Sequence, residues 1–153
     1  MKEIFEPISD AVQSGLIRYV GVSNFNVAQI DEARTYVDVQ SVQNVFSVFK
    51  RQSETDGVLK YCEDTQLTFL AYSPFGGRRK HKQISKQKPL VELGKKYQCS
   101  AYCIALAWLL SKSPCIVPIP GASRCSSIDD SVRALDIPLD PTDIDLINAH
   151  TFA

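Results

Sequence analysis

The chain has 153 residues, of which 17 are basic and 17 acidic, so it has the size of one domain and no net formal charge. The balanced charge argues against a nucleic acid or an anionic membrane as a partner, because both polyanions attract a basic surface. No stretch approaches the roughly 18 apolar residues of a membrane span, and no signal peptide is recognisable at the amino terminus. Five cysteines without a C-x-x-C motif suit reduced thiols, so we expect a cytoplasmic protein.

Helices and strands are predicted to alternate along the chain. Apolar residues at helical spacing, with Pro and polar capping residues, predict helices that begin near residues 7, 26, 53, 89, 101, 126 and 141. Four apolar runs predict strands over residues 16–22, 38–45, 67–72 and 115–119. The polar, Gly- and Lys-rich segment 76–88 is predicted to be a loop.

A few residues are expected to set the helix ends. Gly15 should end the first helix, whose regular part is expected to begin near Pro7. Asn26 and Ser100 are suitable N-caps for the helices that follow them. The segment Ser53–Asp56 resembles a capping box, with Asp in place of the usual Glu.

The repeated strand–helix order predicts an α/β fold with right-handed crossovers between parallel strands. Four such units correspond to half of a TIM (β/α)8 barrel. We therefore expect four parallel strands with flanking helices plus a C-terminal helix, forming a single domain over residues 1–153.

The cysteines also raise the question of a metal site. Cys99 and Cys103 are four residues apart and would share one face of a helix. Neither His81 nor His150 lies at ligand spacing from them, so core packing is the favoured interpretation and no metal site is expected.

Polar side chains follow each predicted strand at its carboxyl end, where parallel α/β sheets bind ligands. They are Ser23 and Asn24, Gln43, the run Tyr72-Ser73-Pro74, and the run Gly121-Ala122-Ser123-Arg124. Amide and hydroxyl groups suit a carboxamide, and the Tyr72 ring could stack on an aromatic ligand. A helix amino terminus beside Arg124 suits a phosphate. Each residue alone could instead be a helix cap or a core side chain, but together they predict a binding site.

Three motifs resemble those of the aldo-keto reductases, NAD(P)H-dependent carbonyl reductases built as TIM barrels. The motifs are Ile17-Arg18-Tyr19-Val20-Gly21-Val22-Ser23-Asn24-Phe25, Phe69-Leu70-Ala71-Tyr72-Ser73-Pro74-Phe75-Gly76 and Pro118-Ile119-Pro120-Gly121-Ala122-Ser123-Arg124, and Gln43 matches as well. These motifs span nearly the whole chain. The resemblance implies that the chain corresponds to the C-terminal half of such a reductase.

The resemblance also implies a role for each matching residue. Ser23, Asn24 and Gln43 would hold the nicotinamide carboxamide, and Tyr72 would stack on the ring. The stretch Ser73–Gly76, which includes Pro74, would line the pyrophosphate. The remaining residues would lie at the adenosine end, with Gly121, Ser123 and Ser127 near the 2′-phosphate and Asp130 and Ser131 toward the adenine.

Two positions depart from the pattern that the family often shows. The family often has Glu-Asn where this chain has Asp130-Ser131, and a longer polar or basic side chain where it has Ser127. The shorter side chains would weaken the contacts to adenine and 2′-phosphate. Arg124 could compensate with its positive charge, so NADP(H) is favoured over NAD(H) as the cofactor.

The basic run Arg78-Arg79-Lys80-His81-Lys82 lies in the predicted loop. A solvated loop is the first interpretation, and a clamp over the phosphates of a bound cofactor is the second. A nucleic-acid surface is disfavoured, because no aromatic residues are interleaved and no wider basic face supports it.

The catalytic residues of the family would lie upstream of this chain. Aldo-keto reductases use a Tyr, a Lys, an Asp and a His from the first strands of the barrel, and no Tyr here has the corresponding sequence context. We therefore expect no catalytic residues in this chain. Without a positioned acid, carbonyl reduction loses the roughly 10²–10⁴-fold that proton transfer supplies, so the chain alone is expected to be inactive or nearly so.

Two other functions stay open at this point. One is a non-catalytic NADP(H)-binding or regulatory module that pairs with a partner, and the other is an unrelated half-barrel that binds only phosphate ligands. A half barrel also leaves two strand edges and inward-facing apolar side chains uncovered. We therefore expect the chain to self-associate or to pair with a complementary half barrel.

Overall fold

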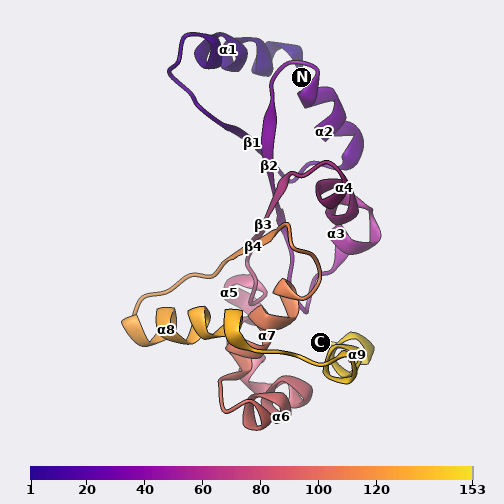
Figure 1. The fold of residues 1–153 in the computed structure, drawn as a ribbon, viewed down its shortest axis with the longest axis vertical. Helices are drawn as coiled ribbons and strands as arrows, with labels where there is room; N and C mark the ends of the chain where they lie inside the picture. The colour runs from indigo at the N-terminus through magenta and orange to yellow at the C-terminus, as the bar shows by residue number, and fades with distance from the viewer. Residues whose placement is uncertain (153) are drawn as a thin grey trace.

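A four-stranded parallel sheet forms the centre of the computed structural model, which describes residues 1–152 (Figure 1). The strands are β1 (Val20–Ser23), β2 (Val39–Val45), β3 (Thr68–Tyr72) and β4 (Ile116–Ile119), and they lie in the order β1-β2-β3-β4. Because each pair of neighbours is parallel, all four carboxyl ends lie at one edge of the sheet.

Helices follow each strand and cover the sheet. They are α1 (Lys2–Gln13), α2 (Val27–Arg34), α3 (Gln52–Thr55), α4 (Val58–Asp64), α5 (Gly77–Lys80), α6 (Lys88–Lys96), α7 (Ala101–Leu110), α8 (Cys125–Arg133) and α9 (Pro141–Ala149), with 3₁₀ segments η1 (His81–Lys86) and η2 (Ala134–Asp136). The predicted order of strands and helices is confirmed, except that the helix expected from residue 53 is divided into α3 and α4 and that α5 lies in the segment predicted to be a loop. Within residues 1–152, no helix has both the length and the apolar character that crossing a membrane requires.

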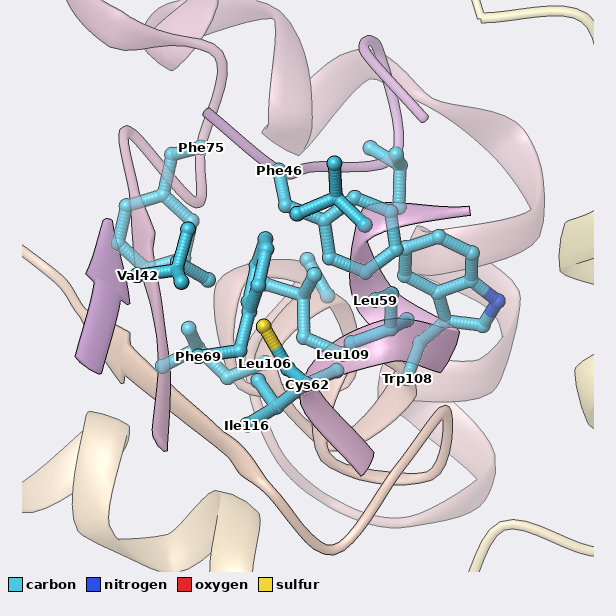
Figure 2. Packing of buried hydrophobic residues seen from close by; sticks show 14 of the residues in the cluster. Val42, Phe46, Leu59, Cys62, Phe69, Phe75, Leu106, Trp108, Leu109 and Ile116 are labelled. Carbon is cyan, nitrogen blue, oxygen red and sulfur yellow. The ribbon is translucent and has the colours of Figure 1, made fainter. Parts of the chain in front are cut away.

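The main core lies between the sheet and α7. Figure 2 shows Phe46 of the β2 end packed between Phe69 of β3 and Trp108 of α7, with ring centroids 5.9 and 5.8 Å apart. All three side chains are fully buried. Eight of the ten residues of α7 are buried, which explains why its sequence is apolar on every side.

The first helix and first strand differ from the sequence prediction. The helix begins at Lys2, with Pro7 inside it. Pro7 and Glu3 are both exposed, so water can replace the hydrogen bond that Pro7 cannot donate. The strand begins at Val20 rather than Leu16. Gly15 has a left-handed φ of 78°, and the Leu16 N–H turns back to bond the Ala11 carbonyl at 2.9 Å, which caps the helix and leaves Leu16 exposed.

Two later predictions are also wrong. Ser53 is buried inside α3 and forms no capping box; the Asp56 carboxylate instead accepts from the Val58 N–H at 3.2 Å. The segment 76–88 is not an open loop, because α5 and η1 occupy most of it. Burial of Ile84 holds η1 against the core, which a count of polar residues does not reveal.

Charged and polar side chains join α6 to α9. The Lys96 Nζ lies 2.8 Å from both carboxylate oxygens of Asp143 and 2.9 Å from Asp140, and the Tyr97 hydroxyl donates to Asp143. Asp140 and Asp143 also form the capping box of α9. Asp143 is buried, and the positive charge of Lys96 compensates the negative charge of its carboxylate.

Asp140 makes folding sensitive to acid. Hydrogen bonds from Thr142 and then from Lys96 lower the pKa of Asp140 below its ordinary value of 3.8. Its contribution to stability is therefore present above that value and is lost as the pH falls through the lower, folded-state pKa. Asp140→Asn keeps a good N-cap but removes the charge. We expect its deficit in unfolding free energy to be largest near neutral pH and to shrink in acid, as measured by urea unfolding at several pH values.

The matched control is Asp129→Asn, at an exposed position of α8. A deficit for Asp140→Asn that stays constant from neutral to acidic pH, as for the control, would contradict this account.

Candidate functional site

The carboxyl ends of β1, β2 and β3 carry one hydrogen-bonded network. The Ser23 hydroxyl donates to the Gln43 carbonyl at 2.9 Å, and the Asn24 N–H donates to the same oxygen at 3.0 Å. The Asn24 amide donates to the Ser23 hydroxyl at 3.2 Å and accepts from the Tyr72 hydroxyl at 3.0 Å. The structure thus brings together Ser23, Asn24, Gln43 and Tyr72, the four residues predicted for the nicotinamide end.

Left-handed backbone conformations shape the turns that follow β1 and β3. Asn24 has a φ of 58° and Ser73 a φ of 51°, which is uncommon for residues other than glycine. Asn24 and Ser73 each directly follow a strand, so the chain turns sharply where it leaves the sheet. Residues held in such uncommon backbone conformations cluster at binding and active sites.

Gly76 closes the turn after β3. Its N–H donates to the Ser73 carbonyl at 2.8 Å, and its φ is 80°. A Cβ at this position would lie 2.5 Å from the Lys80 Cβ and 2.7 Å from the Phe49 ring. Only glycine fits here, and the tight turn leads directly into α5.

A cavity of about 400 Å³ lies between the segment after β3, the start of α7 and α8. Its lining includes five of the predicted adenosine-end residues, Gly121, Arg124, Ser127, Asp130 and Ser131, together with Phe75, His81, Ser100, Tyr102 and Ser126. Ser123 is exposed and lies outside this lining. The structure therefore assembles most of this predicted set, from the loop after β4 and from α8.

A second cavity, of about 310 Å³, adjoins the first. Ser73, Pro74, Gly77, Arg78 and Ile119 line it, and Phe75, His81 and Gly121 line both cavities. The two cavities follow the carboxyl edge of the sheet from the turn after β3 to α8. Their combined lining contains most of the residues predicted for the pyrophosphate and for the adenosine, but neither Gly76 nor Ser123.

An aromatic cluster forms the shared wall of these cavities. The Phe75 and Tyr102 rings pack edge to face with centroids 5.1 Å apart, and the His81 ring lies 5.0 Å from Tyr102. The Tyr102 hydroxyl also donates to the His81 carbonyl at 3.0 Å. The sequence predicted a contact with the cofactor phosphates for His81 only as one interpretation of the basic run, and it predicted no binding role for Tyr102, because only the packing of α7 against η1 brings the two rings together.

Ser100 links α7 to α8 at the floor of the larger cavity. Its hydroxyl accepts from the Tyr102 and Cys103 N–H groups, each at 3.1 Å, and donates to the Asp130 carboxylate. Ser131 in turn donates to the Ser127 carbonyl at 2.8 Å. Asp130 and Ser131 are thus already held by internal hydrogen bonds, and Arg124, which directly precedes α8, places a cationic side chain in the lining of the cavity.

A third cavity, of about 330 Å³, opens beside Asn24 on polar side chains that include Gln29, Lys50 and Asp56. Asn44 also lines it, and its amide donates to the Phe25 carbonyl at 2.9 Å while its Oδ1 is buried without a partner. This polar pocket adjoins the network at the strand ends.

The cysteines lie away from these cavities or at their margins. Burial raises the pKa of the Cys62 and Cys103 thiols to about 12, so both stay protonated at neutral pH and pack as small apolar groups. All five cysteines are free thiols. Among residues 1–152, no cluster of three or more His, Cys, Asp or Glu side chains has the arrangement of a metal site.

The comparison with known families settles the relationship. Residues 1–151 match the aldo/keto reductase family. The chain belongs to that family. Its relatives include the "Uncharacterized oxidoreductase C215.11c" of Schizosaccharomyces pombe, which is 35% identical over 139 residues and aligns with 90% of this chain but 44% of the yeast protein.

Solved aldo-keto reductase structures show the same relationship in space. The thermostable aldo-keto reductase Tm1743, solved with the inhibitor epalrestat, is 31% identical and superposes with a TM-score of 0.83 over 93% of this chain and 52% of its own. The Bombyx mori aldo-keto reductase AKR2E4, solved with NADP, is 28% identical and gives a TM-score of 0.76 over 92% of this chain and 47% of its own. The chain thus spans about half the length of these relatives, and its four parallel strands match about half of an aldo-keto reductase TIM barrel.

The Ser100 hydroxyl is expected to be important for the stability of α7. Ser100→Ala removes the N-cap and leaves Asp130 without its partner, so we expect it to lower the unfolding free energy by about 1–2 kcal/mol. Ser111→Ala, which removes an exposed hydroxyl at the other end of the same helix, is the matched control. Equal urea-unfolding midpoints for the two variants would contradict this role.

Proposed function

We propose that this chain is the carboxyl-terminal, NADP(H)-binding half of an aldo-keto reductase domain. The observation that carries the proposal is the arrangement of the predicted binding residues along the carboxyl edge of the sheet, first a hydrogen-bonded network and then two adjoining cavities. The residues predicted for the nicotinamide, the pyrophosphate and the adenosine follow one another along that edge in the same order. A related silkworm protein was solved with NADP.

At the nicotinamide end, the network would orient a carboxamide. The Ser23 hydroxyl and the Asn24 amide already hold each other in place, so little side-chain entropy is lost when a ligand binds. Tyr72 is tied to Asn24 through its hydroxyl, which fixes the ring for stacking. The Gln43 side chain is half-buried at the same edge and would supply a further donor and acceptor.

At the phosphate end, the turn Ser73–Gly76 and the loop that leads to α8 would hold the anionic groups. Arg78 lines the cavity next to the turn, and Arg124 lines the cavity beside α8. Two cations at these places suit a pyrophosphate and a 2′-phosphate, which supports NADP(H) over NAD(H). Ser123 lies outside the cavity lining, so its proposed role depends on movement of the exposed loop.

The chemistry of the bound cofactor would be hydride transfer to or from a carbonyl carbon. This chain's own residues would bind and orient the cofactor and cover one side of it. The chain contains a Tyr, a Lys and an Asp in contact, namely Tyr97, Lys96 and Asp143, but they join α6 to α9 and line none of the three cavities. The hydrogen bond to Asp143 also raises the pKa of Tyr97, the opposite of what an acid catalyst needs.

The chain alone should therefore bind cofactor and reduce carbonyls very poorly. With NADPH and a reactive aldehyde, we expect turnover to stay far below the roughly 1–10³ s⁻¹ of ordinary enzymes. Turnover in that range by the purified chain would contradict the assignment.

The free thiols also fit a reducing compartment, and we propose a cytoplasmic location on that ground.

The role of Arg124 can be tested by binding. In a fluorescence titration, Arg124→Ala is expected to weaken NADPH binding by about tenfold, because a charge-assisted hydrogen bond to phosphate is lost. NADH binding should change little, because NADH lacks the 2′-phosphate. Arg18→Ala, just before the amino end of β1, is the control and should affect neither cofactor. Equal weakening of NADPH and NADH would contradict the proposed place of the 2′-phosphate.

A further inference from the structure

Exposed apolar side chains gather at two places on the surface. Of the nine exposed large hydrophobic side chains in residues 1–152, three belong to α1 and the segment leading into β1, namely Ile4, Leu16 and Tyr19. Five belong to β4, α8 and η2, namely Val117, Ile119, Ile128, Val132 and Leu135. Only Leu146 of α9 lies elsewhere among the described residues. The two groups accompany the first and the last strand of the sheet.

Four residues of the second group, all but Ile119, line a groove of about 390 Å³ beside β4. Leu106 and Leu110 of α7 form one wall, and Ile128 and Val132 of α8 form the other. Ser131 is the only polar residue in the lining. An apolar groove beside an unpaired strand is costly to leave in water, and it fits another strand with its flanking apolar side chains.

Main-chain groups at the two free sheet edges are complementary. The Asn24 N–H donates to the Gln43 carbonyl of β2, and the Phe69 N–H of β3 donates to the Cys115 carbonyl just before β4. Because the main-chain groups of successive residues point to alternate sides of a strand, these two bonds show which residues of β1 and β4 point away from the sheet. Gly21 and Ser23 face outward from β1, with both N–H groups. On β4 the outward-facing residues are Ile116, whose N–H bonds the Ser113 carbonyl, and Pro118, which has no N–H.

The edge of β4 therefore offers carbonyl acceptors and no free N–H within the described chain, whereas the edge of β1 offers N–H donors as well as carbonyl acceptors. Two β4 edges cannot form a ladder with each other, because neither provides a donor. A β4 edge can accept from a β1 edge. When the two strands run in the same direction, such a pairing between two copies continues the parallel sheet from one copy into the next.

The geometry of the sheet limits how many copies can join in this way. Four strands in sequential order match about half of an eight-stranded barrel. Each copy thus spans half of the circumference of a barrel, so a second copy joined head to tail brings its own β4 back to the first β1. The ring closes at two copies, and both apolar groups become covered.

We propose that two copies of this chain join head to tail, with β4 and α8 of one copy against β1 and α1 of the other, to close one eight-stranded barrel. The occupant of the apolar groove is thus the β1 edge of a second copy. This inference rests on the sheet edges and apolar groups and does not depend on cofactor binding.

Sedimentation velocity of the full chain at micromolar concentration tests the proposal. We expect a species of twice the 17.0 kDa of one chain. A monomer, or a series of larger open polymers, would overturn the closed two-copy arrangement. A monomer would leave the proposed function standing, because that is tested by cofactor titration.

Two charge substitutions test the head-to-tail contact. Ile128→Asp and Tyr19→Asp lie on opposite sides of the predicted junction, and both side chains are exposed, so folding should survive. Each is expected to raise the dimer dissociation constant by about a hundredfold or more, because burying an unpaired carboxylate is costly. Leu146→Asp, at the exposed apolar position outside both groups, should leave the dimer intact. Circular dichroism confirms that each variant is folded.

Mixing the two variants gives a sharper result. In a head-to-tail ring, one junction of the mixed pair joins two unaltered surfaces, so the mixture should contain more dimer than either variant alone. If Tyr19→Asp leaves the dimer intact while Ile128→Asp disrupts it, α8 contacts itself across a two-fold axis and the proposal is wrong.

Discussion

The parallel register of four strands is the constraint on which the rest of the molecule depends. Pairing Ser23 with Gln43, and Val45 with Tyr72 and then Ile119, aligns the strand ends at one edge. Polar side chains that lie far apart in sequence then fall within hydrogen-bonding distance of one another. Slipping one strand by a residue would send its inward side chains to the opposite face and dismantle the network around Asn24.

The same constraint explains why one face of the sheet is covered by helices while its two outer edges are not. Parallel strands need helical crossovers, and these cover one face of the sheet with α7 at its centre. Within residues 1–152, no crossover covers the outer edges of β1 and β4, and the apolar residues beside them are exposed in a single copy. The proposed binding at the carboxyl edge and the proposed association through the lateral edges are therefore separate consequences of one architecture.

Local sequence signals predicted the elements whose ends depend on nearby residues. Asn26 and Ser100 cap helices as expected, because a side-chain oxygen reaches its own first turn without help from the rest of the fold. The strands were recognisable because both faces of a parallel sheet favour apolar residues. Leu16 was assigned to a strand by the same rule, but the helix cap at Gly15 holds it back at the end of α1.

The sequence predicted those residues of the candidate site that lie at or near the end of a strand. The network of Ser23, Asn24, Gln43 and Tyr72 follows from topology alone. The cavity wall of Phe75, His81 and Tyr102 depends on α7 packing against η1, a contact between segments that no short motif encodes. The engagement of Asp130 by Ser100 also joins residues thirty positions apart, so their mutual hydrogen bond has no local sequence signal.

Hydrogen–deuterium exchange of the chain with and without NADP⁺ tests the central claim most directly. The account predicts slower exchange in two segments, the turn from Tyr72 to Gly77 and the stretch from Gly121 to Ser131, with no change in α6 or α9. Unchanged exchange in both segments at saturating NADP⁺, or protection confined to other parts of the chain, would contradict a cofactor site along the carboxyl edge.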